Sequence, residues 1–362
     1  MKKKFYVLIG GLMITALFLF AFLVKNEEIR SSYPEEAITL PPSQEVLGQN
    51  FVVGIPGTSL DEETRIFLEQ IRPGGVILYY RNYETPEQFR NFISELQEVA
   101  ARTTQYPYFI MIDEEPGGAT RLNLFKNVFA FGTPEWERIE QDIKTMADIG
   151  VNVNLAPLAD FPFDEDSFIK YRIQAHTPAA LVDFNKKFIA LSQQNDVSTT
   201  LKHFPGMGVF VEDPHDTLPR ASVGKTVLDE SLEIFESGIT AGTDFVMTGH
   251  AVYDDIDPGV PATLSKKITT DVLRKQLGFS GLVITDDLSD MPLIIGRDID
   301  LTEATIESLD AGHNLIMFSH RPDKTKRVFE ELLERVQNDP EFRLITKNNY
   351  RRIAALKEIR DL

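Results

Sequence analysis

Short runs of β-branched and aromatic residues recur along the chain from Phe51 onward, separated by longer segments that mix apolar and polar positions. Runs of this length and composition are typical of buried β-strands. Eight strands are predicted, at residues 51–55, 75–79, 109–113, 151–157, 199–203, 245–250, 282–286 and 315–319. Apolar residues with helical periodicity lie between them, which predicts helices at residues 60–71, 86–101, 135–149, 178–194, 228–241, 265–277 and 302–311.

The regular alternation of strand and amphipathic helix predicts a parallel sheet covered by helices. Eight such units fit a closed (β/α)8 barrel of the TIM type better than an open sheet. An open doubly wound sheet is the alternative, but no glycine-rich dinucleotide fingerprint follows the first predicted strand. The predicted fold class is therefore α/β, with one barrel domain whose functional residues lie at the carboxyl ends of its strands.

The amino-terminal residues predict a membrane segment ahead of the barrel. Lys2, Lys3 and Lys4 precede an uncharged apolar stretch at residues 5–24, which is long enough for one transmembrane helix. A cleaved secretory signal is the alternative, but it has a shorter apolar core and a clearer cleavage site. Because cationic flanks are retained, we expect the amino terminus in the cytoplasm and the body on the extracellular side of the cytoplasmic membrane.

The expected domain boundaries follow from this pattern. Residues 1–25 form the membrane anchor or signal segment, residues 26–44 form a polar linker that contains Pro34, Pro41 and Pro42, and residues 45–362 form the barrel. The formal net charge of −18 argues against nucleic acid as a partner, because such surfaces need clustered Lys and Arg. The sequence has no cysteine, so the fold is held by its core without disulfides.

Ionisable residues gather where the predicted strands end. Asp113 ends the third strand, Lys202 and His203 end the fifth, His250 ends the sixth and Asp286 ends the seventh, while His215 follows in the loop after the fifth. Taken singly, each aspartate fits a helix cap and each histidine fits a satisfied core residue. A charged group at the end of a buried strand is costly unless it is paired or used. Their convergence from four strands predicts an active site.

Several motifs then resemble a known family. They are KHFPGMG at residues 202–208 with Asp213-Pro214-His215, and VITDDLS at residues 283–289, with weaker matches PGGVIL at 73–78 and APLAD at 156–160. Together they resemble glycoside hydrolase family 3, specifically its single-domain bacterial β-N-acetylglucosaminidases (β-N-acetylhexosaminidases), over about residues 47–318. Several motifs in the same order make a chance similarity improbable.

The resemblance implies a retaining exo-acting glycosidase on amino-sugar glycans of the cell wall type, with no metal and no cofactor. By position, Asp286 is the nucleophile that forms a covalent glycosyl-enzyme, and His215 is the acid/base, oriented by Asp213. A histidine suits acid/base work because its usual pKa of about 6.5 lies near working pH. The resemblance also implies a set of residues that bind the substrate: Asp113, Lys202, His203, Arg121 and His250.

The chain departs from the family pattern at several positions. Met207 replaces a histidine, and Pro214 replaces the serine between the acid/base histidine and its aspartate. Pro116 and Ala119 alter the segment after Asp113, which also lacks its first arginine. Asp166 stands where the family has a sugar-binding arginine, and Lys170 or Arg172 is expected to reach the same space.

Four alternative functions stay open at this point. A neutral imidazole does not repel an anionic acceptor, so phosphorolysis can compete with hydrolysis. A plain β-glucoside is an alternative substrate. The altered loops also fit a glycan-binding barrel with weak or no turnover. A metal-dependent hydrolase would use His203, His215, His250 and Asp286 as ligands, although the first strand offers no His-x-His pair.

Overall fold

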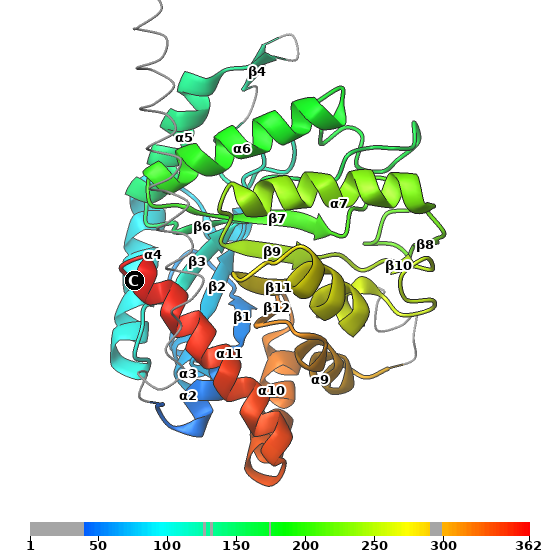
Figure 1. Ribbon diagram of the computed structural model, residues 1–362. Coiled ribbons are helices and arrows are strands. Elements are labelled where there is room, and N and C mark those ends of the chain that lie inside the picture. The colour runs from blue at the N-terminus through cyan, green and yellow to red at the C-terminus, as the bar shows by residue number, and fades with distance from the viewer. Residues whose placement is uncertain (1–39, 126–127, 131–132, 174, 290–298) are drawn as a thin grey trace, which may run out of the picture. The chain divides into compact units, whose positions relative to one another are not determined.

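The computed structural model describes residues 40–125, 128–130, 133–173, 175–289 and 299–362. Eight parallel strands close into a barrel in the order β1-β12-β11-β9-β7-β6-β3-β2 (Figure 1). Each predicted strand corresponds to one of them, so the predicted (β/α)8 barrel is confirmed. The barrel strands are β1 (Phe51–Gly54), β2 (Gly75–Leu78), β3 (Phe109–Ile112), β6 (Val153–Asn154), β7 (Ser198–Phe204), β9 (Phe245–Thr248), β11 (Leu282–Asp287) and β12 (Leu315–Phe318).

Each predicted helix also forms, with ends that shift by a few residues. These helices are α3 (Glu62–Ile71), α4 (Pro86–Thr103), α5 (Trp136–Asp148), α6 (Pro178–Gln194), α7 (Lys225–Thr240), the π-helical η3 (Lys267–Gln276) and α9 (Leu301–Ala311). Elements that were not predicted are α2 (Ser43–Gly48), the 3-10 turns η1 (Tyr80–Asn82) and η2 (Ala262–Leu264), α10 (Pro322–Asn338) and α11 (Pro340–Ile359). Two short sheets complete the description, β4 (Phe129–Ala130) with β5 (Thr133–Pro134), and β8 (Arg220–Ala221) with β10 (Val252–Tyr253).

Local sequence signals explain where the helices begin. Thr85 and Thr177 precede α4 and α6, and each side-chain oxygen accepts a hydrogen bond from a backbone N–H of the first turn, at 3.1 Å in both cases. A proline follows each threonine, and its fixed φ angle suits the first helical position. These caps fix the entry of the two helices and therefore the lengths of the loops before them.

Two apolar layers hold the barrel together. Inside it, side chains such as Val52, Phe109, Met111 and Phe245 are fully buried, and Phe109 packs edge-on against Phe245 with ring centroids 5.3 Å apart. A second layer lies between the strands and the surrounding helices. The filled interior makes the barrel a packed core rather than a pore, so a ligand site is expected beyond the strand ends.

Helix α11 closes the amino-terminal end of the barrel. Its residues Ile353 and Leu356 join the interior cluster, and Lys357 Nζ donates to Gln49 Oε1 and to the Gly74 carbonyl oxygen, at 2.9 Å each. Gln49 and Gly74 lie just before β1 and β2, so these contacts mark the bottom of the barrel. The opposite, carboxyl-terminal end stays available for a site.

The predicted membrane segment at residues 5–24 and most of the predicted linker lie outside the described residues. Helix α2 begins at Ser43, inside the range predicted as linker. Among the residues that the structure describes, none of the helices is both long and apolar enough to cross a bilayer.

Candidate active site

A cavity of about 620 Å³ lies at the carboxyl-terminal end of the barrel, where the predicted site residues meet. Six of the eight predicted site residues line it, and they come from loops or strand ends on both sides of the barrel. The cavity is lined by Tyr79, Tyr80, Arg81, Asp113, Ala119, Arg121, Arg172, Lys202, His203, His215, Met247, Asp286, Asp287, Met317 and His320. The expected convergence of β3, β7 and β11 residues is therefore present in space.

Alternating charges cross one wall of this cavity. Lys202 Nζ lies 2.7 Å from Asp113 Oδ1 and 2.7 Å from Glu115 Oε1, so one buried ammonium joins two carboxylates. Each carboxylate has a second cation, because Arg121 Nη2 lies 3.2 Å from Asp113 Oδ2 and Arg172 Nη2 lies 2.6 Å from Glu115 Oε1. The row carries three cations and two anions, and it fixes hydrogen-bonding groups that a sugar hydroxyl can use.

For the central groups of this row, the combined effect of the ion pairs on the pKa is larger than the opposing effect of burial. Burial by itself would raise the pKa of Asp113, but Lys202 and Arg121 hold it below its ordinary value. Burial would likewise lower the pKa of Lys202, but Asp113 and Glu115 raise it. Buried charges persist only when paired in this way. Asp113 and Lys202 are therefore both charged at neutral pH.

His203 is held by a carboxylate that the sequence analysis did not select. Asp160 Oδ2 lies 2.7 Å from His203 Nδ1, and the same carboxylate accepts hydrogen bonds from the backbone N–H groups of His203 and Met207 at 3.0 and 2.7 Å. On the other side of the ring, His203 Nε2 lies 3.8 Å from Asp286 Oδ2. The imidazole is thus fixed between two carboxylates. Met207 itself is fully buried in the core and does not line the cavity.

Asp286 lies near the end of β11 with its carboxylate at the cavity. Its Oδ1 accepts a hydrogen bond from the Asp287 backbone N–H at 2.8 Å. Burial alone would raise its pKa, but His203, His250, this N–H and His215 together lower it below the ordinary value. The neighbouring Asp287 has a different role, because its Oδ1 accepts from Ser289 N, Ser289 Oγ and Ser319 N and so secures the turn after the strand. Asp286 is therefore the ionised carboxylate that is free to reach a ligand.

His215 lies at the mouth of the cavity, in the long loop after β7. Its ring Nδ1 is 2.6 Å from Asp213 Oδ1, and the same oxygen accepts from the His215 backbone N–H at 2.9 Å. The ring remains 65% exposed, which leaves Nε2 available to a ligand. Burial of Asp213 acts to raise its pKa, but hydrogen bonds from His215 lower it overall. Asp213 reaches the site through His215 and does not line the cavity.

His250 is the one predicted substrate-binding residue that the structure places elsewhere. Its side chain is fully buried, with Nδ1 2.7 Å from Thr263 Oγ1 and Nε2 2.9 Å from the Asp287 carbonyl oxygen. Burial lowers its pKa. With both ring nitrogens bonded to protein, it supports the turn behind Asp286 and has no ring nitrogen left for a sugar. The structure therefore gives no support to the prediction that His250 binds the substrate.

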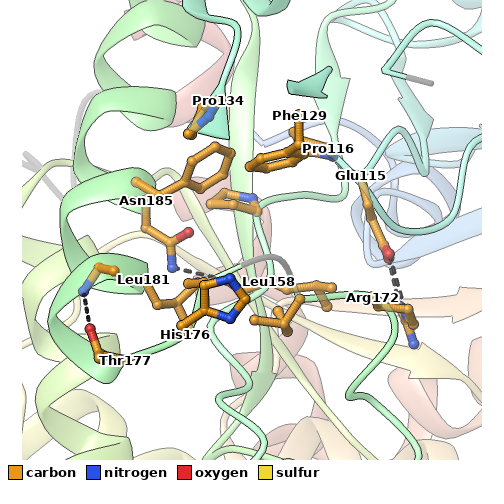
Figure 2. Close-up of a pocket in the computed structure, with 15 residues that line it drawn as sticks. Glu115, Pro116, Phe129, Pro134, Leu158, Arg172, His176, Thr177, Leu181 and Asn185 are labelled. Atoms are coloured by element: carbon orange, nitrogen blue, oxygen red, sulfur yellow. Dashed lines mark hydrogen bonds and ion pairs between the residues drawn. The ribbon is translucent and has the colours of Figure 1, made fainter. Parts of the chain in front are cut away.

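The sequence comparison left Lys170 or Arg172 to fill the place of a missing arginine, and the structure selects Arg172. Lys170 points to the surface and pairs with Asp166 at 3.4 Å. Arg172 lines the cavity, and its Nε and Nη2 donate to the two oxygens of Glu115 at 3.1 and 2.6 Å (Figure 2). Of the two residues expected to replace the arginine missing at Asp166, Arg172 is therefore the one that lines the cavity.

Sequence analysis missed further cavity residues on the β1 side. Tyr79, Arg81 and His320 come from the ends of β2 and β12, with Arg81 4.4 Å above the Tyr79 ring and 3.3 Å from His320 Nδ1. Arg81 also donates to the Ile55 and Ser319 carbonyl oxygens. In the sequence, these residues could have been recognised by their position at or just after the end of an apolar run. Many loop residues share that position, so it did not single them out. Within the described ranges, no group of three His, Asp or Glu side chains is arranged to hold a metal ion.

Comparison with known proteins agrees with the barrel fold. The curated β-hexosaminidase of Nitrosomonas eutropha is 29% identical over 301 residues, which cover 78% of this chain and 83% of that protein. A β-N-acetylhexosaminidase structure from Beutenbergia cavernae superposes with a TM-score of 0.78 at 27% identity, over 89% of this chain and all of that one. A family 3 β-N-acetylglucosaminidase structure from Paenibacillus sp. FPU-7 gives a TM-score of 0.79 at 29% identity and covers 90% of this chain, which spans only 63% of that protein.

The model of the glycosyl hydrolase family 3 N-terminal domain matches residues 44–356, which is nearly all of the described barrel. Because this match, the closed barrel and the motifs after β7 and β11 agree, the chain belongs to glycosyl hydrolase family 3.

Proposed function

We propose that this protein is a retaining, exo-acting β-N-acetylglucosaminidase that removes terminal N-acetylglucosamine from amino-sugar glycans of the cell wall type. The observation that carries the proposal is the shared cavity, which has an ionised carboxylate, Asp286, and an exposed imidazole, His215, on its walls. His215 contributes to the lowered pKa of Asp286, so the histidine acts electrostatically on this carboxylate across the cavity. The named activities of the family relatives support the same substrate class.

In the first step, an Asp286 oxygen attacks the anomeric carbon while His215 Nε2–H protonates the departing glycosidic oxygen. This gives a covalent glycosyl-enzyme and a neutral imidazole. In the second step, His215 takes a proton from water, which attacks the anomeric carbon and releases Asp286. Asp213 keeps the proton on Nδ1 and stabilises the protonated ring, as an aspartate does in a triad.

The sugar ring is held by the charged row on the cavity wall. Asp113 accepts from sugar hydroxyls, while Lys202, Arg121, His203 and Arg172 can donate to hydroxyl or acyl oxygens. Since the row is paired before a sugar arrives, little rearrangement is needed on binding. The wall is closed by buried ion pairs, and this supports an exo-acting enzyme that accepts one terminal sugar.

A chromogenic aryl β-N-acetylglucosaminide tests the activity directly, with the purified full-length protein in detergent. Turnover that is lost in Asp286→Ala supports the proposal, and a mechanism-based fluorosugar should label the peptide that contains Asp286. A label on Asp287 would overturn the assignment of the nucleophile. A sugar that binds the wild-type protein without any turnover would instead favour the glycan-binding barrel.

Phosphorolysis is a second candidate reaction, because the acid/base is an imidazole. A neutral His215 leaves an anionic acceptor unrepelled during the second step, where a carboxylate would oppose it. Product analysis with and without phosphate separates the two reactions. Hydrolysis predicts free N-acetylglucosamine in both cases, whereas phosphorolysis predicts the sugar 1-phosphate when phosphate is present. An aryl β-glucoside in the same panel tests the plain glucosidase alternative.

We also propose that residues 1–25 anchor the protein in the cytoplasmic membrane, with the barrel on the extracellular side. The support is the length of the apolar stretch and the lysines before it. Fractionation of cells that express the full chain tests the anchor. Recovery of the whole protein from the medium, with a new amino terminus after the apolar stretch, would show a cleaved signal instead.

A further inference from the structure

A second cavity of about 290 Å³ lies beside the active site, against the first turns of α6 (Figure 2). Its walls come from the loop after β3, the β4–β5 hairpin, the end of β6 and the segment before α6. Most of the lining is apolar or aromatic, including Phe129, Leu158, Leu181 and Phe184. Mainly apolar pockets with a few placed polar groups are the usual form of small-molecule sites.

One polar side chain of the lining, Asn185, carries an acceptor atom that has no partner among the described residues. Asn185 is 1% exposed, and its Nδ2 donates to the Leu158 carbonyl oxygen at 2.9 Å. Its Oδ1 is buried and accepts no hydrogen bond from the described part of the chain. Figure 2 shows this side chain lying over the cavity between the aromatic rings and His176. A buried acceptor in such surroundings calls for a donor, and a ligand N–H or O–H would supply it.

The wall toward the active site is the Glu115–Arg172 ion pair. Arg172 lines both cavities, and Glu115, which is 1% exposed, is shared between Arg172 and Lys202. Since Glu115 and Arg172 pair with each other, this wall of the second cavity favours a neutral ligand. Because Glu115 also pairs with Lys202, a ligand that displaced the Glu115–Arg172 pair would also shift Lys202 in the wall of the active-site cavity.

We propose that this cavity is a second ligand site, which takes a neutral aromatic molecule of one or two rings with a single N–H or O–H donor for Asn185 Oδ1. The size supports this class, because an apolar cavity of roughly 150 Å³ holds one benzene ring. We further infer that its occupancy changes sugar affinity through the Glu115–Arg172 pair. This coupling rests on the proposed function, whereas the site itself does not.

Indole, which has two fused rings and one N–H, is the probe. Titration calorimetry with the full-length protein should show one bound indole per chain. Ala180 is an exposed helix residue that lines the cavity, so Ala180→Phe should fill the space and weaken indole binding by about tenfold or more. Ala179→Phe, the neighbouring exposed position outside the lining, is the matched control and should bind as the wild type does.

Asn185→Leu keeps the bulk and removes the acceptor, so it should weaken indole binding by up to about tenfold. If the wild-type protein binds no indole, or if Ala180→Phe and Ala179→Phe bind it equally, the site is overturned. Loss of binding in both helix variants would point to a general effect on α6 and would also overturn it.

The coupling is tested by the affinity for N-acetylglucosamine with and without saturating indole. An effect of about fivefold or more is expected in the wild type, with the same factor in the reverse titration, and none in Ala180→Phe. Equal affinities for N-acetylglucosamine with and without indole would refute the coupling but not the second ligand site. Indole binding by a protein that neither binds nor cleaves the sugar would overturn the proposed function alone.

Discussion

At the scale of single residues, the candidate site separates two histidines by their surroundings. The His215 side chain is 65% exposed and its ring is hydrogen-bonded to Asp213, whereas His203 is buried between Asp160 and Asp286. An acid/base must exchange protons with a leaving group and with water, so the exposed ring suits that task. The buried ring, fixed on both sides, suits the positioning of a sugar and of the nucleophile.

The role of His215 predicts an effect that depends on the leaving group. In His215→Ala, kcat/KM for a natural disaccharide should fall by about 10²- to 10⁴-fold, because its departing oxygen needs a proton. An activated aryl glycoside with an acidic phenol should lose much less. Steady-state rates for the two substrates check this, and equal losses would contradict the role of acid.

Asp160 is a positioning residue, since it acts through His203 and the Met207 backbone. Asp160→Asn keeps the shape but replaces one acceptor oxygen by a donor, so the His203 contact is lost. We expect kcat/KM to fall by about ten- to a hundredfold, with retained covalent labelling at Asp286. Exposed Asp166→Asn is the matched control on the same loop and should leave kcat/KM unchanged. If both variants behave alike, Asp160 does not position the site.

At the scale of elements, the segment after β7 carries half of the site and depends on close backbone packing. A side chain at Gly208 would overlap the Phe161 carbonyl oxygen, and the Gly208 carbonyl accepts from Phe163 N at 3.1 Å. The two loops after β6 and β7 are therefore locked together at this point. Asp213 and His215 follow a few residues later, so their position at the mouth depends on that contact.

Gly208→Ala should push these loops apart. We expect a loss of about 1–3 kcal/mol in the free energy of unfolding, as for other overpacked sites, together with a lower kcat/KM. Denaturant unfolding and aryl glycoside kinetics measure the two effects. Val211→Ala, at an exposed position of the same loop, is the control. A normal kcat/KM in Gly208→Ala would show that the acid/base does not depend on this contact.

At the scale of the whole molecule, stability and function lie at opposite ends of the barrel. Lys357 closes the bottom among Gln49, Gly74 and the Phe109 ring, far along the strands from the cavity at the top. Burial lowers the pKa of Lys357 to about 7, against the slight opposing effect of Glu45. This group should therefore influence unfolding without touching the reaction.

The sign of the pH effect follows from proton binding. Between about pH 7 and 10.5, the unfolded chain binds a proton at Lys357 that the folded chain does not, so this residue makes stability rise with pH in that window. Lys357→Met should remove that rise, about 1.4 kcal/mol per pH unit, from the free energy of unfolding. Urea unfolding of both proteins across the window measures the difference. Parallel pH profiles would refute the lowered pKa, and kcat/KM should be the same in both.

Much of this architecture follows from the sequence. The eight apolar runs and the amphipathic helices between them favour a closed barrel over an open sheet, because strands buried on both faces and helices with one apolar face can be covered in few other ways. The barrel then fixes the end at which the ionisable groups gather. Asp113, Lys202, His203 and Asp286 were found by that argument, since each lies at or just after a strand end, whereas His215 was found in the long loop that follows β7.

A position at a strand end does not determine which atoms a side chain contacts. Only the tertiary structure decided those contacts. His250, just after β9, does not line the cavity, whereas His203, near the end of β7, does. The reason is that Thr263 and the Asp287 carbonyl occupy both ring nitrogens of His250. The tertiary structure also brought Arg172, Glu115 and Asp160 into the site through contacts between loops far apart in sequence. The spacing of residues along the chain determines which strand carries a side chain and which end of the barrel it occupies. Its burial and its pairing with other loops determine its role in the site. Burial and pairing depend on neighbouring residues that are brought together only by folding.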